Sequence, residues 1–389
     1  MKKVLVCILF FLLTILFPFA VGATDDPSNT SDSSTVSEYD FEDQLKASGA
    51  DELTDELPQE TKELLRKLGI DSIGPDSLLG LTTGNVSSTL VDTVKESAKG
   101  PLKSGAAVGG IILLCALLEG FKVSFGERPL AGVFGGVAAL SVGVAIVLPV
   151  LEVIQKAGEA VRASSAFMLS FIPVFAGITT AAGQPVTASL YQGLLFGVAQ
   201  VVSSAANTIV VPLLSLFLAF SLVAAVVPNL NLSATAGSIQ KVASWVLGLV
   251  MTVFVGILSI QGVVGNASDG VAMKAAKFFS GNFIPVVGSA LGDALGAVQG
   301  CVGLLKSTVG SFGILAVVVI FVPPLLQSLI WQFILNIGAA FADLFDLKQI
   351  SAMLRSTSKV LNLLIAVMLC CSLLLIISTT ILLTLGVSV

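Results

Sequence analysis

Few residues of this chain stand where they could do chemistry, and two of them are ionisable groups in an apolar stretch. The hydrophobic run 283–305 contains Asp293 and ends on Lys306. A charge at membrane depth is costly, so such a residue usually pairs with another group or marks a pathway. The alternative is that this stretch skims the membrane interface and that both groups reach water. The sequence leaves both interpretations open.

Other kinds of catalytic or binding site are excluded by composition. The chain has no histidine, which rules out a Ser-His-Asp or Cys-His site and removes the commonest transition-metal ligand. Its five cysteines form no C-x-x-C motif, and the adjacent pair Cys370–Cys371 suits neither zinc nor an ordinary disulfide. No phosphate-binding loop or dinucleotide fingerprint is present. We therefore expect no enzyme activity, no cofactor and no metal site, and the charge pattern does not indicate nucleic-acid binding.

Charge is distributed unevenly along the chain. Residues 24–103 carry 17 of the 25 acidic residues, whereas residues 104–389 carry only 11 Lys/Arg and 8 Asp/Glu. The hydrophobic content is 55% and the mean hydropathy is +0.97, far above the usage of soluble domains. Apolar runs of about 20 residues are what a membrane helix requires. The sequence therefore predicts an all-α polytopic membrane protein with a multi-pass domain over 104–389.

The amino terminus is typical of an exported protein. Lys2 and Lys3 precede a short apolar core and a small-residue cleavage site, so residues 1–23 are interpreted as a signal peptide. An uncleaved anchor helix is the alternative. In either case the residues that follow are expected outside the cytoplasm.

Residues 24–103 are predicted to form a small, acidic, extracytoplasmic region, here called the head. It begins as a disordered Ser/Asp-rich tether and continues as short helices. We predict a helix over 58–68 with Gly69 as its stop, and another over 85–98 that ends at Gly100-Pro101. The head either docks a partner or only spaces the signal from the first membrane helix.

About eight membrane crossings reconcile the apolar runs with the basic loops. The loops 120–129 and 341–359 are basic and are therefore expected in the cytoplasm. With the head outside, both constraints hold if 283–305 is a hairpin or re-entrant element that returns to its own side. The apolar runs lie at about 105–121, 130–154, 165–183, 189–206, 208–227, 241–265, 283–305, 312–338 and 360–386.

Two proline-centred motifs recur at an offset of 112 residues. The FIPV motif around Pro173 recurs around Pro285, and the Pro-Leu-Leu motif that starts at Pro212 recurs at Pro324. These matches predict an internal parallel repeat, with copies at about 130–227 and 241–338, although apolar sequences also match by chance.

Proline removes a backbone donor, and freed backbone groups at membrane depth must be covered by protein or by a water-filled cavity. We therefore expect re-entrant or broken helices at these four prolines. Such breaks either line a permeation or binding pathway or are structural kinks between packed helices.

The residues just before Pro285 are expected to lie along the membrane surface. Lys274 and Lys277 stand one turn apart in the stretch 269–279, with apolar residues available to the opposite face. This pattern favours an amphipathic helix in the membrane interface.

One segment has a pattern specific enough to compare with known families. It is 269–294 (DGVAMKAAKFFSGNFIPVVGSALGDA), most specifically 276–287, and it agrees with ELPQETKELLRKLGID at 56–71 and LLEGFK at 117–122. In these residues, and in their order along nearly the whole chain, the sequence resembles the stage III sporulation protein AE family. The low-complexity stretch 24–37 carries none of the resemblance.

The resemblance implies a function and a place in the cell. It implies a multi-pass protein of the mother-cell membrane around the forespore, with its N-terminal region outside and no catalytic residues. It also implies assembly with other stage III sporulation proteins and a forespore partner in the intermembrane space. Together they would form a channel, or feeding tube, that is related to secretion systems and sustains late forespore development. A free-standing secondary transporter and a non-conducting scaffold remain as alternatives.

Overall fold

The structure is a computed structural model that describes residues 38–125, 131–226 and 288–384, together with parts of 241–271 (241–242, 245–246, 248–249, 252–261, 264–265, 267–269 and 271). Every element in these residues is helical. The predicted signal peptide and tether lie outside the described residues. In chain order the elements are α2 (Glu38–Ala47), the 3-10 turn η1 (Asp51–Thr54), α3 (Gln59–Lys67), α4 (Pro75–Leu79), α5 (Thr83–Phe125), α6 (Ala131–Ala181), α7 (Pro185–Ala205), the π-helical turn η2 (Ala206–Val210), α8 (Val211–Val226), α10 (Gly288–Leu344) and α11 (Lys348–Thr384).

Several helices are much longer than a bilayer is thick. α6 has 51 residues and α10 has 57. At 1.5 Å per residue these are about 76 and 86 Å long, against a hydrocarbon core of roughly 30 Å. Five helical stretches of the described residues are long and apolar enough to cross a membrane: Gly84–Leu118, Val137–Ala181, Pro185–Val202, Gly300–Leu344 and Lys348–Leu383. Shorter apolar helices cover Thr208–Phe220 and Thr252–Gln261. The all-α fold with several candidate spans is confirmed, whereas a count of eight is not.

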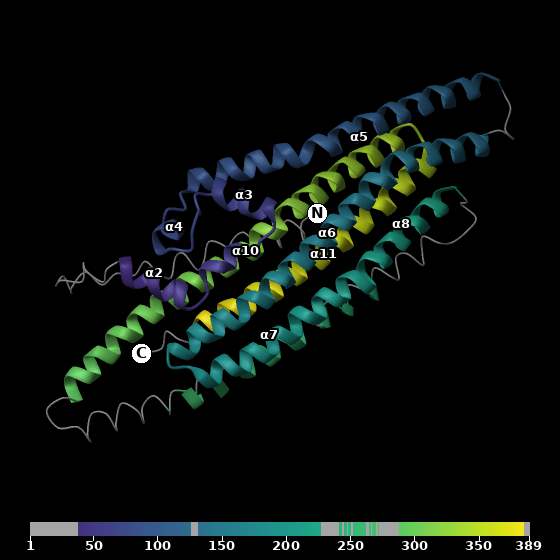
Figure 1. Cartoon of the computed structure of the whole chain (residues 1–389). Helices are drawn as coiled ribbons and strands as arrows, with labels where there is room; N and C mark the ends of the chain where they lie inside the picture. The colour runs from purple at the N-terminus through teal and green to yellow at the C-terminus, as the bar shows by residue number, and fades with distance from the viewer. Residues whose placement is uncertain are drawn as a thin grey trace.

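The long helices lie side by side as antiparallel rods (Figure 1). The end of α5, the start of α6 and the α10–α11 turn lie at one end of the bundle. The α6–α7 turn lies toward the opposite end, where the short helices of the head are found (Figure 1). α10 packs against α5, α6 and α11, so it occupies the centre of the bundle.

The helices α10 and α6 pack closely in the core. Every residue from Ala316 to Phe321 is buried, as expected for a helix that is apolar all round. On α6 the Phe171 ring stacks between Phe167 and Phe175, with centroid distances of 5.7 and 5.1 Å. Gly313 of α10 lies directly on this stack, because a Cβ there would stand 2.4 Å from Cε2 of Phe171. Close approach of the two backbones therefore depends on glycine at this position.

Four helices end in the same kind of turn, in which a residue of positive φ reverses the chain. In each, the next N–H bonds a carbonyl of the last helical turn, as in the Schellman motif. Asp346, at φ 55°, is the only non-glycine with positive φ among the described residues. The predicted stop of α3 at Gly69 is confirmed by its φ of 88°. The positive-φ glycines at these turns are Gly49, Gly69 and Gly183.

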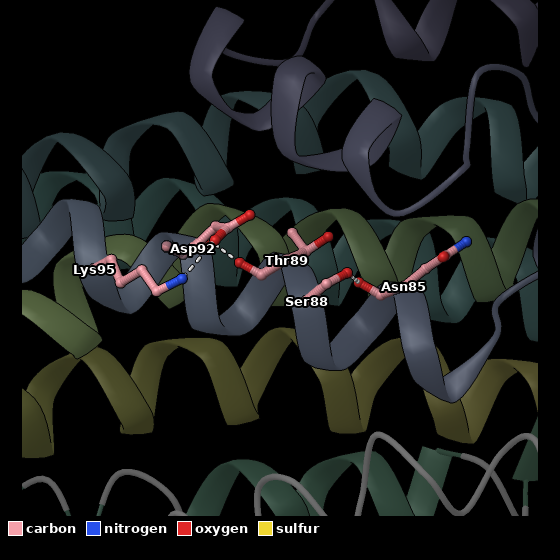
Figure 2. A network of polar contacts seen from close by, with 6 residues as sticks. Asn85, Ser88, Thr89, Asp92 and Lys95 are labelled. Carbon is pink, nitrogen blue, oxygen red and sulfur yellow. Dashed lines mark hydrogen bonds and ion pairs between the residues drawn. The ribbon is translucent and has the colours of Figure 1, made fainter.

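The head does not stand apart from the bundle. Its apolar residues, such as Leu53, Leu65 and Ile70, are buried, and α2, α3 and α4 all contact α10. The hydroxyl of Thr89 on α5 donates to the carbonyl of Lys67 at 3.2 Å, which ties the end of α3 to α5. The polar contacts of this first part of α5, such as that between Lys95 and Asp92, come from successive turns of the one helix (Figure 2).

Two predicted interruptions of helices are absent from the structure. α5 continues through Gly100 and Pro101 into the apolar run, so the predicted helix end there is wrong. A proline costs about 3 kcal/mol in a helix interior, but the continuing helix buries Val108 and Ile112. The predicted hairpin over 283–305 also differs from the structure, in which residues 288–344 form one uninterrupted helix.

The predicted proline breaks differ in a similar way. α6 runs on through Pro173, and α10 runs on through Pro323 and Pro324. Buried aromatic residues flank these prolines, and this packing favours the continuous helix despite the lost hydrogen bond. Pro212 instead follows the π-helical turn η2, a local adjustment that can re-satisfy backbone groups near a proline. Pro285 lies outside the described residues.

The internal repeat is not confirmed by the fold. The turn at residues 181–185 falls, at the offset of 112, on residues 293–297. The first stretch reverses the chain between α6 and α7, whereas the second lies inside α10. The two sequence copies therefore have different local structures at this point.

Candidate functional site

The junction between α6 and α7 is the place where polar groups gather among apolar helices. α6 ends at Ala181, and Gly183 reverses the chain at φ 85°. The N–H of Gln184 then bonds the carbonyl of Thr179 at 3.2 Å. The carbonyl of Gln184 in turn accepts the N–H of Ala188 at 3.0 Å, so Gln184 stands at the N-cap position of α7. Pro185, with no N–H and a fixed φ, is well suited to the first helical position.

The start of α7 is capped from a distant part of the chain. Side-chain caps are normally Ser, Thr, Asp or Asn at the N-cap itself, a position that Gln184 occupies here. The N–H groups of Val186 and Thr187 instead donate to the carboxylate of Asp269, at 3.0 Å to Oδ1 and 2.9 Å to Oδ2. A carboxylate at a helix N-terminus is also favoured by the helix dipole. All free backbone donors of this helix start are therefore satisfied.

A buried lysine completes the cluster. Lys306 of α10 is 4% exposed, and its Nζ donates to Oε1 of Gln184 at 2.9 Å. Asp269 is likewise 4% exposed and lies near enough to Lys306 for its charge to attract the ammonium group. A buried charge is stable only when it is paired and hydrogen-bonded. The cluster meets this condition with one negative and one positive group.

Two further contacts hold the same segment against α7. The hydroxyl of Tyr191 donates to the carbonyl of Leu258 at 3.1 Å, and both residues are fully buried. Gly265 lies against Thr187, since a Cβ at Gly265 would stand 3.1 Å from Cα of Thr187. The described residues of 252–269, here called the rim segment, therefore run antiparallel to α7 with Asp269 at the helix start.

Chemically, this arrangement is a structural polar link in which a carboxylate and an ammonium group attract each other. The carboxylate oxygens are both engaged with backbone donors, so Asp269 is a poor general base. The Nζ of Lys306 donates to the side-chain amide of Gln184, which is not a nucleophile that the lysine could activate. The hydroxyl of Thr187 is buried without a hydrogen-bond partner. The cluster thus joins three parts of the chain, namely the α6–α7 junction, the rim segment and α10.

Comparison with known proteins places this bundle in a family. The family model described as stage III sporulation protein AE matches residues 79–386, which include every long helix and the whole polar cluster. The chain belongs to the stage III sporulation protein AE family. It is similar to stage III sporulation protein AE of Bacillus subtilis (strain 168), with 27% identity over 242 residues, or 61% of each chain. The chain thus spans about three fifths of the length of that curated relative. No solved structure matches the chain.

The residues predicted from sequence are spread over this stage III sporulation protein AE fold. Pro173 and Pro212 are exposed, on α6 and at the start of α8, while Pro324 is buried in α10. Asp293 lies in the first turns of α10, and the position of its side chain is not described. Lys274 and Lys277 lie outside the described residues. A role of these positions in a pathway or an interfacial helix stays a prediction.

Of the predicted residues, only Lys306 belongs to the cluster. Its burial and its bond to Gln184 contradict the interpretation in which it reaches water. Asp269, Gln184 and Thr187 were not predicted as site residues. A signal did exist: the Gly-Gln-Pro sequence at 183–185 starts a helix with a weak local cap. It indicates that an acceptor must come from elsewhere, but not which one.

Proposed function

We propose that this chain is a membrane subunit of the sporulation channel that links mother cell and forespore and sustains late forespore development. The family match over residues 79–386 carries the proposal, because it covers the membrane domain and not only the head. The candidate spans support a multi-pass subunit. Its partners would be other stage III sporulation membrane proteins and a forespore protein in the intermembrane space.

The charge distribution of the structure supports an orientation with the head outside. Lys348 and Arg355 begin α11 at the end of the bundle away from the head (Figure 1). Lys122 belongs to the last turns of α5 at that same end. Basic residues next to membrane helices favour the cytoplasmic side. In the proposed orientation the head and the Asp269–Lys306 cluster would face the intermembrane space of an engulfed forespore.

The packing of the bundle centre bears on whether the subunit conducts alone. Apolar residues fill the middle of α10 from Ala316 to Phe321 on all sides. A water-filled pathway through a single chain would instead need polar groups at its lining. This favours a channel wall built by several subunits over a free-standing transporter. A non-conducting scaffold is consistent with the same packing and is the second candidate.

The proposal is tested by purifying an affinity-tagged chain from sporulating cells of its own host. We expect other stage III sporulation membrane proteins to co-purify, and a fluorescent fusion to concentrate around the engulfed forespore. A chain that purifies alone and is spread evenly over the cell membrane would instead support a free-standing transporter. A second measurement separates a channel subunit from a scaffold. Single cysteines are placed at exposed positions of α6, such as Gly177, and treated with a water-soluble thiol reagent. Cysteines that stay unreactive in a complex that still assembles would favour the scaffold.

A further inference from the structure

The start of α7 depends on a residue that no local sequence rule would supply. Val186 and Thr187 both need an acceptor for their N–H groups; Thr187 is fully buried, whereas Val186 is 39% exposed, so the need is strictest at Thr187. Leaving such donors unpaired costs on the order of 1–3 kcal/mol each. Asp269 meets this need with one oxygen for each donor. The side-chain carboxylate of Asp269, at the end of the rim segment, therefore attaches this segment to α7.

The positive charge of Lys306 stabilises the buried negative charge of Asp269. A buried carboxylate that loses its counter-charge is strongly destabilised. Lys306 supplies the counter-charge and also bonds the side chain of Gln184, whose backbone carbonyl accepts the first hydrogen bond of α7. The lysine thus reaches the same helix start from a third helix.

The rim segment packs one face against the bundle and leaves the other face exposed. Its inner face buries Leu258 and Phe254. Its outer face leaves Val253, Ile257 and Ile260 between 43% and 67% exposed. A helix with one buried and one exposed face lies at the edge of a bundle, so the contacts of its inner face and of Asp269 hold it there.

We propose that Asp269 and Lys306 form a latch that fixes the rim segment and α10 to the start of α7, with Asp269 acting as a remote helix cap. When the carboxylate is neutralised or removed, α7 loses its cap and the rim segment loses its terminal anchor. The contacts of Tyr191 with Leu258 and of Thr187 with Gly265 then weaken together, because they lie on the same face. The latch couples the second half of the chain to the first. This proposal does not depend on whether the complex conducts.

A cap and a simple ion pair differ in one property that can be measured. Exchanging the two charges, as in D269K/K306D, keeps one negative and one positive group at these two positions. It destroys the cap, because an ammonium group cannot accept a hydrogen bond from a backbone N–H. A double charge exchange therefore restores a simple pair but not the latch.

The test is hydrogen–deuterium exchange of the full chain in detergent, read by mass spectrometry on peptides covering 185–195 and 252–261. D269A should accelerate exchange in both peptides by about 10-fold or more, as expected from losing one buried and one part-buried hydrogen bond. D269N, which keeps one carbonyl acceptor, should show a smaller acceleration and serves if D269A does not fold. K306M should also accelerate exchange, and D269K/K306D should exchange as fast as D269A.

The control is K156M, at an exposed lysine of α6, which should leave both peptides unchanged. A peptide from the buried part of α11 should be unchanged in every variant. If D269K/K306D exchanged at the parental rate, the interaction would be an ordinary ion pair and the cap would be contradicted. Unchanged exchange of both peptides in D269N and D269A would contradict the latch itself.

Discussion

The carboxylate of Asp269 accepts the backbone N–H of Thr187 at 2.9 Å, although 82 positions separate the two residues along the chain. The same carboxylate accepts the neighbouring N–H of Val186. Helix α7 can therefore start with the buried N–H of Thr187 satisfied, because a residue from the rim segment provides its cap. The helix start and the rim segment should consequently gain or lose their order together.

The reversal at Gly183 should tolerate no side chain. Its φ of 85° is strained for any residue with a Cβ, so Gly183→Ala should destabilise the chain by about 1–2 kcal/mol. The measurement is the free energy of unfolding in detergent, from a denaturant or thermal transition. Gly110→Ala is the matched control, because Gly110 is helical with nothing within 4 Å of its Cβ position. It should be neutral or slightly stabilising, and equal losses in both variants would contradict the assigned turn.

The contact between α10 and α6 should be sensitive to a single methyl group. Gly313→Ala would place its Cβ 2.4 Å from the Phe171 ring, and overpacking of this kind typically costs about 1–3 kcal/mol. Gly303→Ala, in the same helix with nothing within 4 Å, should stabilise by up to about 1 kcal/mol. Both are read as shifts of the thermal midpoint in detergent. A Gly313→Ala variant as stable as the parent would show that the two helices are farther apart than described.

The hydroxyl of Tyr191 should contribute to holding the rim segment. Tyr191→Phe removes its 3.1 Å hydrogen bond to the carbonyl of Leu258, and we expect a loss of about 1 kcal/mol. The matched control is Ser189→Ala, an exposed hydroxyl that bonds only a carbonyl of its own helix. Its effect should be within about 0.5 kcal/mol. Equal stability of Tyr191→Phe and the parent would argue against the described packing of the rim segment on α7.

The orientation predicts opposite labelling of the two ends of the bundle. In a chain whose native cysteines are replaced and which is made in growing, non-sporulating cells, Glu60→Cys on α3 should react with an impermeant maleimide added to the intact cells. Lys348→Cys at the start of α11 should react only after the cells are permeabilised. Both native side chains are exposed, so a difference reports the side of the membrane. The reverse pattern would overturn the orientation.

Short-range rules predicted the local structure well. The helix over 58–68 was expected from its acidic start, basic end and glycine stop, and α3 runs from Gln59 to Lys67 with Gly69 at φ 88°. The all-α class followed from the long apolar runs. These features depend on residues within one or two turns of each other, so the sequence contains the information directly.

Features that depend on distant contacts could not be predicted in the same way. Pro101 and Pro173 indicate helix ends locally, but burial of neighbouring side chains keeps both helices continuous. Asp269 could be recognised as a charge in an apolar region, whereas its role depends on a helix start more than 80 residues away. Lys306 could be recognised as an ionisable group at the end of an apolar stretch, but its partner Gln184 lies 122 positions earlier.

The central claim, a subunit required for spore maturation, is tested most directly by counting heat-resistant spores of the host after an in-frame deletion of this chain. We predict that the deletion strain completes engulfment but yields almost no heat-resistant spores. Restoring the chain at a second site should return the count to that of the parent. A deletion strain that forms heat-resistant spores at the parental frequency would contradict the account.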